Sequence, residues 1–304
     1  MAVILAAVVA LAALSAIVWL RRARKLRLPP GPKPLPIVGN VLDMPSSKPW
    51  EKYSEWSKEY ATDVLYLRLP MQDVMILSSF KAVTDLFVKR SQIYSDRPRS
   101  AVMQLMQCED LFAMASYTAS WRDQRKALHP FLSQSTVSQF RQTQLHQARC
   151  FLTWVNDSPK DVRKHIRRWI TSNVVEVIYG KTVSGMEDPY IIMAEKAVEG
   201  ISKAHIPGIY WIDYFPLLKY IPSWAPGATS RRFAEHYAPY IRKLRDVPYD
   251  EVKTGIEAGT ARSSIATHIA EDIQARYGGT EEQAIQDELA KMATCTLYGG
   301  KSIG

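Results

Sequence analysis

The sequence reads Tyr117-Thr118-Ala119-Ser120-Trp121-Arg122-Asp123-Gln124-Arg125-Lys126, and His129 follows three residues later. Trp121, Arg125 and His129 are spaced four residues apart, so in a helix their side chains lie along one face. An indole N–H and a guanidinium that point the same way can bind a carboxylate. A solvated basic helix with one buried tryptophan explains the same pattern, and the motif alone does not decide between the two.

Most of the chain shows the 3.6-residue spacing of apolar side chains that is typical of amphipathic helices. This spacing occurs at residues 50–60 and then at 79–90, 118–129, 134–155, 160–179, 187–204, 229–246, 262–276 and 281–298. Two short β-type runs, residues 64–69 and 74–77, indicate a small antiparallel hairpin between them. The sequence therefore predicts a mainly α fold with a small N-terminal β-hairpin.

Two regions lack a clear helical pattern. Residues 95–117 contain Asp96-Arg97-Pro98 and then a stretch rich in methionine and leucine. The apolar residues there that suit contact with a ligand are Met103, Leu111, Phe112 and Met114. Ordinary core packing explains the same composition. Residues 206–227 combine six aromatic side chains with four prolines, which suits a membrane contact, a channel mouth or a packed surface loop.

The N-terminal segment has the pattern of a membrane anchor. Residues 2–20 are apolar except for Ser15, and as a helix they span about 28 Å, close to the ~30 Å of a bilayer core. Five cations follow within residues 21–27, whereas a secretory signal peptide carries its charge before the apolar run. The positive-inside rule keeps these cations and the later residues in the cytosol. We therefore expect an uncleaved transmembrane helix at residues 1–20.

A proline-rich segment follows the basic run. It reads Leu28-Pro29-Pro30-Gly31-Pro32-Lys33-Pro34-Leu35-Pro36-Ile37-Val38-Gly39-Asn40. Five prolines in eight residues exclude a helix or a central strand, because each proline fixes φ and removes a hydrogen-bond donor. We expect residues 21–40 to form a basic stop and a stiff, extended hinge, although a generic linker or an SH3 ligand has a similar composition.

The net charge of +9 does not indicate a nucleic-acid partner. Six of the 39 Lys and Arg residues lie in the first 33 positions, which contain no Asp or Glu, so the other 271 residues carry only +3. The excess charge therefore belongs to the membrane stop. The sequence also lacks the HExxH and CxxC metal motifs. Gly299-Gly300-Lys301-Ser302 is not a phosphate-binding loop, because Cys295 stands where that motif needs glycine.

Several of these signals occur together in the order and spacing of one family. The apolar anchor, the basic stop, the proline-rich segment, the hairpin, Asp96-Arg97-Pro98 and the Trp121–Arg125 motif resemble a microsomal, fungal-type cytochrome P450. The resemblance covers the chain from the anchor to the last predicted helix. One departure is Thr118, where members commonly have glycine, and we expect it to change the turn before the helix.

The resemblance implies a haem-dependent monooxygenase, which inserts one oxygen atom from O₂ into a lipophilic substrate with electrons from a NADPH-dependent reductase. Trp121 and Arg125 would bind the haem propionates, in agreement with the carboxylate-binding geometry of their spacing. The residues implied to contact the substrate are Met103, Leu111, Phe112 and Met114. The resemblance also implies a single-pass protein of the endoplasmic reticulum membrane, with its soluble part in the cytosol and no nucleic-acid partner.

The resemblance weakens at the C-terminal end. Residues 281–300 resemble the start of the central helix that crosses the haem, where the family carries an acidic residue and a threonine that relay protons. This sequence has Ser302 and Ile303 in their place. We therefore expect residues 41–304 to form a partial haem-thiolate monooxygenase domain that is truncated within this helix.

The predicted haem site is incomplete for a second reason. The family binds the haem iron through a cysteine thiolate, which favours O–O cleavage. None of the three cysteines, Cys108, Cys150 and Cys295, has the sequence context of that ligand. We therefore expect no monooxygenase turnover from this polypeptide. The alternative function is that of a non-catalytic, membrane-tethered helical fragment that acts through protein contacts.

Overall fold

A computed structural model describes residues 28–36, 38–45, 47–69, 72–204, 210–213 and 215–299. The chain divides into two compact units after Ser95. The predicted mainly α architecture with a small hairpin is confirmed. The transmembrane helix predicted at residues 1–20 lies outside the described residues. Among the residues that are described, no helix is long and apolar enough to cross a bilayer.

The first unit is built on the predicted hairpin. Strands β1 (Val64–Leu69) and β2 (Gln72–Leu77) pair antiparallel, with Val64 opposite Leu77. Leu65 and Leu67 of β1 are fully buried and form a small core with Trp56 of α2 (Pro49–Glu59). The apolar positions of the helix and of the strand therefore meet, as their spacing predicts.

The proline-rich segment is packed against β1. The N–H of Tyr66 donates to the carbonyl of Pro30 at 3.0 Å. The N–H of Arg68 donates to the side-chain oxygen of Asn40 at 2.8 Å, and the N–H of Asn40 donates to the carbonyl of Arg68 at 2.7 Å. At Gly31 the backbones approach so closely that a Cβ atom would lie 2.1 Å from the carbonyl oxygen of Tyr66. Leu35 and Gly39 pair across a tight turn within the segment. Pro30 has no N–H, so it contributes its carbonyl to the contact with β1.

Short helical elements complete the first unit. They are η1 (Val41–Asp43), α3 (Phe80–Val83), η2 (Thr84–Val88) and α4 (Ser91–Tyr94). The helix predicted at residues 79–90 is thus an α-helical turn that continues into a π-helical turn. Ser79 caps it, because its hydroxyl accepts the N–H of Ala82 at 3.0 Å.

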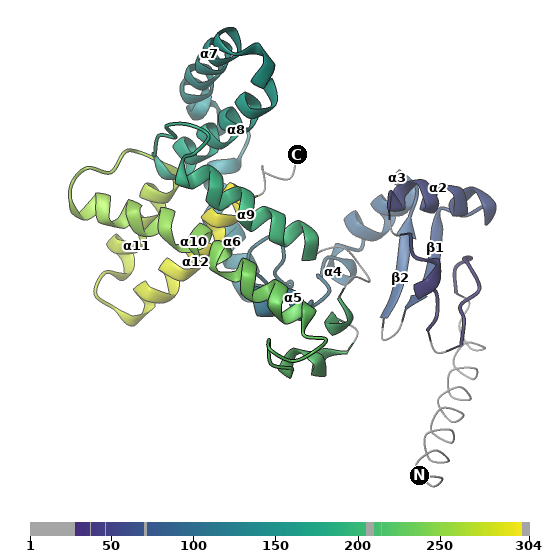
Figure 1. Cartoon of the computed structure of the whole chain (residues 1–304). Coiled ribbons are helices and arrows are strands. Elements are labelled where there is room, and N and C mark those ends of the chain that lie inside the picture. Colours follow the sequence, from purple (N-terminus) through teal and green to yellow (C-terminus); the bar gives the residue numbers. More distant parts are fainter. Residues whose placement is uncertain are drawn as a thin grey trace. The chain divides into compact units, whose positions relative to one another are not determined.

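The second unit is helical (Figure 1). Its elements are α5 (Ala101–Met106), α6 (Ala119–Leu132), η3 (Val137–Phe140), α7 (Arg141–Asp157), η4 (Pro159–Asp161), α8 (Val162–Tyr179), α9 (Pro189–Ala204), η5 (Trp211–Asp213), η6 (Pro216–Tyr220), α10 (Thr229–Glu257), α11 (Ile265–Tyr277) and α12 (Glu281–Gly299). Helix α7 packs along α8, and α9 along α10. Helix α12 contacts α6, α8, α9, α10 and α11, so it lies at the centre of the unit.

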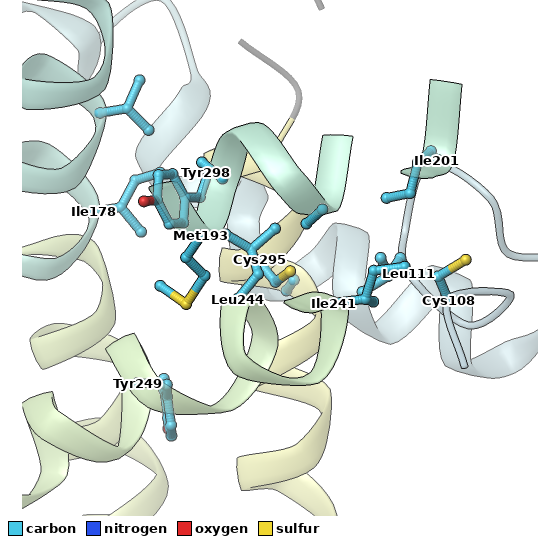
Figure 2. Packing of buried hydrophobic residues seen from close by; sticks show 14 of the residues in the cluster. Cys108, Leu111, Ile178, Met193, Ile201, Ile241, Leu244, Tyr249, Cys295 and Tyr298 are labelled. Carbon is cyan, nitrogen blue, oxygen red and sulfur yellow. The ribbon is translucent and has the colours of Figure 1, made fainter. Parts of the chain in front are cut away.

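The core of the second unit lies around α12. Ile178 of α8, Met193 of α9 and Leu244 of α10 are buried in one apolar cluster with Cys295 and Tyr298 of α12 (Figure 2). Because each helix places its apolar face toward α12, burial of these side chains stabilises the whole arrangement.

Helix α10 is longer than predicted. The pattern predicts its end at residue 246, but the helix continues through Pro248 to Glu257. A proline inside a helix costs about 3 kcal/mol, because it removes one hydrogen bond and crowds the preceding turn. Tyr249 and Val252, which follow the proline, are almost fully buried, and burial of two such side chains contributes roughly 1.5–3 kcal/mol each. Packing therefore outweighs the local preference.

Two further elements differ from the sequence pattern. The helix predicted at residues 134–155 is divided, because a 3₁₀ turn, η3, precedes α7. Residues 95–117, which lack a clear helical pattern in the sequence, contain the short helix α5. Ser100 caps α5 by accepting the N–H of Met103 at 3.2 Å, so the start signal was present in the sequence.

Candidate functional site

Helix α6 carries the tryptophan and the arginine that the sequence singles out. Thr118 has an extended backbone, and its hydroxyl accepts the N–H of Trp121 at 3.4 Å. A threonine at this position stabilises the start of a helix by about 1 kcal/mol. The departure from glycine at position 118 therefore supplies a helix cap.

Trp121 lies in an aromatic cluster at the start of α6. The ring of Phe112 stacks on it at a centroid distance of 5.2 Å and an interplanar angle of 13°, and the ring of Tyr117 lies 4.9 Å away. The Cζ atom of Arg125 is 5.7 Å from the centroid of the Trp121 ring. Trp121 and Arg125 thus share one face of the helix, as their four-residue spacing predicts.

The guanidinium of Arg125 is available to an external group. Its side chain is exposed, and no carboxylate in the described part of the chain forms an ion pair with it. The neighbouring Arg122 instead lies over the ring of Tyr117, at 5.8 Å from its centroid. A guanidinium presents a planar set of donors that matches both oxygens of a carboxylate. The arrangement at Arg125 can therefore bind an acidic ligand.

Asp96 connects the preceding loop to the start of α6. Its Oδ1 atom accepts the backbone N–H groups of Arg97 and Tyr117, each at 2.9 Å. The hydrogen bond from Tyr117, followed by that from Arg97, lowers the pKa of the Asp96 carboxyl. The Nε atom of Arg97 donates to the carbonyl of Ala113 at 3.4 Å. The Asp96-Arg97-Pro98 motif therefore holds the loop that carries the aromatic neighbours of Trp121.

Gln124 is a positioning residue that the sequence analysis did not single out. Its side chain is fully buried, and its Nε2 atom donates to the carbonyl of Asp110 at 2.9 Å. Its Oε1 atom is buried without a hydrogen-bond partner among the described residues. Leu128, four residues later, is also buried. The sequence did contain a signal for this role. Gln124 precedes the core residue Leu128 by four positions, so it lies on the buried face of the helix, where its amide needs a polar partner.

The residues predicted to contact substrate lie in different environments. Met103 and Leu111 belong to the apolar core, and Met114 packs against it. Phe112 is part of the aromatic cluster around Trp121. The structure thus brings Phe112 to the predicted haem-binding pair, and the role of all four residues in substrate binding stays a prediction.

The two regions that the sequence left without helical pattern are in contact with each other. The hydroxyl of Ser100, before α5, donates to Oδ1 of Asp213 at 2.9 Å, and the N–H of Val102 donates to the same atom at 3.3 Å. More than a hundred residues separate the partners along the chain. No local pattern indicates such a pair, because it forms only when the helices pack.

The three cysteines differ in their burial. Cys108 and Cys295 are buried, and burial raises the pKa of each thiol to about 12, so both are neutral thiols at physiological pH. Cys150 on α7 is partly exposed, with its Sγ atom 3.7 Å from Nε2 of His146. Within the described residues, no group of three or more side chains could hold a metal ion.

Comparison with known proteins identifies the family. The cytochrome P450 family model matches residues 29–298. Tryptamine 4-monooxygenase of Psilocybe cyanescens is 36% identical over 250 residues, which are 81% of this chain and 49% of that protein. Cytochrome P450 monooxygenase COX2 of Coprinopsis cinerea is 38% identical over 257 residues, 83% of this chain and 48% of that protein.

A third relative covers more of the chain. Cytochrome P450 monooxygenase 98 of Postia placenta is 33% identical over 288 residues, which are 94% of this chain and 54% of that protein. The chain spans about half the length of the curated relatives it matches. The family model and these relatives together show that the chain belongs to the cytochrome P450 family.

Proposed function

We propose that this chain supplies the haem-carboxylate-binding half of a fungal-type monooxygenase. Membership of the cytochrome P450 family supports haem as the cofactor and monooxygenation as the reaction class. The observation that carries the proposal is the exposed guanidinium of Arg125 beside the fixed indole of Trp121. Haem carries two propionate carboxylates, and the guanidinium of Arg125 and the indole N–H of Trp121 are donors suited to a carboxylate.

Each residue of the site has a separate part in this proposal. Arg125 would bind a propionate through its guanidinium, and Trp121 would donate its indole N–H to a propionate. Phe112 and Tyr117 hold the Trp121 ring by packing against it. Haem, when bound, supplies the iron that activates O₂.

We propose further that the 304-residue chain by itself does not catalyse the monooxygenase reaction. The two buried thiols, Cys108 and Cys295, lie in the apolar core with their pKa raised to about 12. A cysteine binds metal as the thiolate, and formation of a thiolate in an apolar core is costly. Cys150 lies on α7, which is not the helix that carries Trp121 and Arg125. The thiolate that the family uses to bind haem would then come from another polypeptide segment.

The ferrous–carbon monoxide difference spectrum tests this function. We expect the 304-residue chain, supplied with haem, to show no thiolate-type absorption band. A chimera in which residues 29–298 replace the matched part of a fungal relative should show that band, because the relative supplies the thiolate. A thiolate-type band from the 304-residue chain would overturn the proposed inactivity. A haem-free but folded chimera would overturn the assignment of α6.

The substrate of such an enzyme would be a lipophilic small molecule. One relative is named for oxidation of tryptamine, a small aromatic amine, and this name supports a small-molecule substrate. Met103, Leu111, Phe112 and Met114 would shape access to the haem. Electrons would come from a NADPH-dependent reductase, and the exposed cations Arg122 and Lys126 of α6 suit an acidic partner surface.

We propose that the protein resides in the endoplasmic reticulum membrane with its helical units in the cytosol. The apolar run at residues 2–20 and the five cations after it support a single-pass anchor. The surface around η6 supports a second contact, because Leu217, Tyr220 and Trp224 are 79%, 70% and 83% exposed. Aromatic side chains of this kind favour the lipid interface.

The aromatic surface is held in a fixed form by two arginines of α10. Arg231 donates to the carbonyl of Lys219 at 3.0 Å, and Arg232 donates to the carbonyls of Ser223 and Ala225 at 2.9 Å and 3.2 Å. The exposed apolar side chains are therefore presented by an ordered segment. This order lowers the entropy cost of a membrane contact.

Carbonate extraction of microsomes tests the anchor. We expect the 304-residue chain to stay in the membrane pellet, whereas most of a variant that lacks residues 2–27 should be released, because an exposed aromatic surface binds far more weakly than a spanning helix. Leu217→Glu and Trp224→Glu in the shortened variant should also release the protein that still binds through the aromatic surface. Release of the full chain by carbonate would contradict the anchor.

A further inference from the structure

The helical unit contains a cavity between the end of α8 and the start of α11. Its volume is about 350 Å³, near the lower end of the range of roughly 300–1,000 Å³ that is typical of small-molecule sites. Two charged side chains line it, Glu176 of α8 and Arg262 of the turn before α11. Its aromatic lining consists of Phe131 of α6, Phe140 of η3 and His268 of α11. The cavity therefore combines one carboxylate, one guanidinium and several rings.

The two charged groups of the cavity do not form an ion pair with each other. Both residues are described, and their charged nitrogen and oxygen atoms are more than 4.0 Å apart. The guanidinium of Arg262 donates to Oγ1 of Thr182 at 3.1 Å and pairs with no carboxylate in the described part of the chain. The half-buried Glu176 accepts a hydrogen bond from the neutral amide of Gln147 at 2.5 Å. Each charge is therefore open to a ligand group of the opposite sign.

The backbone that carries Arg262 is held on both sides. The hydroxyl of Thr267 donates to the carbonyl of Arg262 at 2.8 Å, and Ser264 caps α11 by accepting the N–H of Thr267 at 3.1 Å. At the end of α8, Gly180 has a φ of +66°, and a Cβ atom there would lie 3.0 Å from the carbonyl oxygen of Arg262. The end of α8 and the turn before α11 are thus in close contact, and this order lowers the entropy cost of binding a ligand.

The aromatic part of the lining is also fixed by packing. The rings of Phe131 and His268 are nearly parallel, with an interplanar angle of 16° and a centroid distance of 6.2 Å. The Nε2 atom of His268 lies 3.2 Å from Oγ of Ser263. Phe131 and Phe140 both pack against the apolar core of the unit. Such rings favour contact with another planar, apolar group.

We propose that this cavity binds a free amino acid with an aromatic side chain. The ligand's carboxylate pairs with Arg262, and its ammonium group pairs with Glu176. Its ring packs against Phe131 and Phe140. A purely apolar molecule fits less well, because it would cover both charges without pairing them. None of the residues assigned above to haem binding lines this cavity, so the ligand is distinct from the haem.

Fluorine NMR of para-fluoro-L-phenylalanine tests this site in the full 304-residue chain, purified in a mild detergent. Para-fluorophenethylamine lacks the carboxylate, and N-acetyl-para-fluoro-L-phenylalanine lacks the ammonium group. We expect the amino acid to bind at least five times more tightly than either analogue, because only the amino acid pairs with both charges. Equal affinities for the three compounds, or no response of the amino acid's signal, would overturn the proposal.

Substitutions in the cavity give a second measurement. Arg262→Gln and Glu176→Gln should each weaken binding of the amino acid at least five-fold. The matched controls are Arg276→Gln and Glu271→Gln, which make the same charge changes at exposed positions of α11 outside the cavity. These two variants should leave the affinity unchanged, and circular dichroism shows whether all four remain folded. Equal losses in the cavity variants and the controls would show a general effect of charge and would contradict the site.

This inference does not rest on the function proposed above. Its measurement is the binding of a small zwitterion and requires neither turnover nor a haem spectrum. A chain that binds the amino acid but holds no haem would therefore contradict the proposed function alone. A haem-loaded chimera that gives no fluorine response would contradict only the assignment of the cavity.

Discussion

In a chimera that carries residues 29–298 of this chain, Arg125→Ala is expected to weaken haem binding about thirty-fold. A hydrogen-bonded charge pair with a carboxylate contributes about 2 kcal/mol, and each 1.4 kcal/mol corresponds to roughly a factor of ten. Arg125 has no ion-pair partner among the described residues, so its removal leaves no other charge unpaired. Titration of the apo-chimera with haem, followed by absorbance, measures the change.

Two further variants make this result specific. Lys126→Ala removes the adjacent cation from another side of α6, and we expect it to change haem affinity less than two-fold. Arg125→Lys keeps the charge but loses the planar pair of donors, so its affinity should fall between the two. Equal losses for Arg125→Ala and Lys126→Ala would show a general effect of charge and would contradict a propionate contact at Arg125.

Gly200→Ala is expected to destabilise the second unit, although alanine is the better helix former. Replacement of a glycine inside a helix such as α9 favours folding by about 1 kcal/mol. A Cβ atom at position 200, however, would lie 2.6 Å from Cγ of Tyr237. Tyr237 is buried, and the rings of Phe233 and His236 lie 4.8 Å and 4.7 Å from it, so it has no room to move.

Overpacking of this kind costs about 1–3 kcal/mol and should exceed the gain in helix propensity. We expect the melting temperature of the full chain, followed by circular dichroism, to fall by about 3–6 °C. Gly255→Ala is the matched control, because a Cβ atom there would meet Ala261 at an ordinary 3.5 Å. Its melting temperature should stay the same or rise. An unchanged melting temperature for Gly200→Ala would show that α9 and α10 can separate slightly.

The centre of the candidate site could be predicted because it depends on local geometry. Trp121 and Arg125 are one helical turn apart, and any helix over this segment brings them to one face. The same holds for the hairpin at residues 64–77, where the side-chain period alone indicates the two strands. In these places tertiary contacts only add to a preference that the segment already has.

The supports of the site could not be predicted in this way. Gln124 is recognised as a positioning residue only when its amide is seen to reach the carbonyl of Asp110. Ser100 meets Asp213 across more than a hundred residues. Both contacts require the helices to pack first, since a polar side chain has no sequence period that identifies its partner.

The sequence by itself thus determined the helical class of the protein, its hairpin and the shared helical face of Trp121 and Arg125 on α6. Tertiary structure decided the continuation of α10 through Pro248, the core positions of Met103 and Leu111, and the cavity between α8 and α11. The physical reason is the range of the forces involved. Backbone propensity and side-chain periodicity act within a few residues, whereas burial depends on which helices meet, and its free energy can exceed a local preference of about 3 kcal/mol.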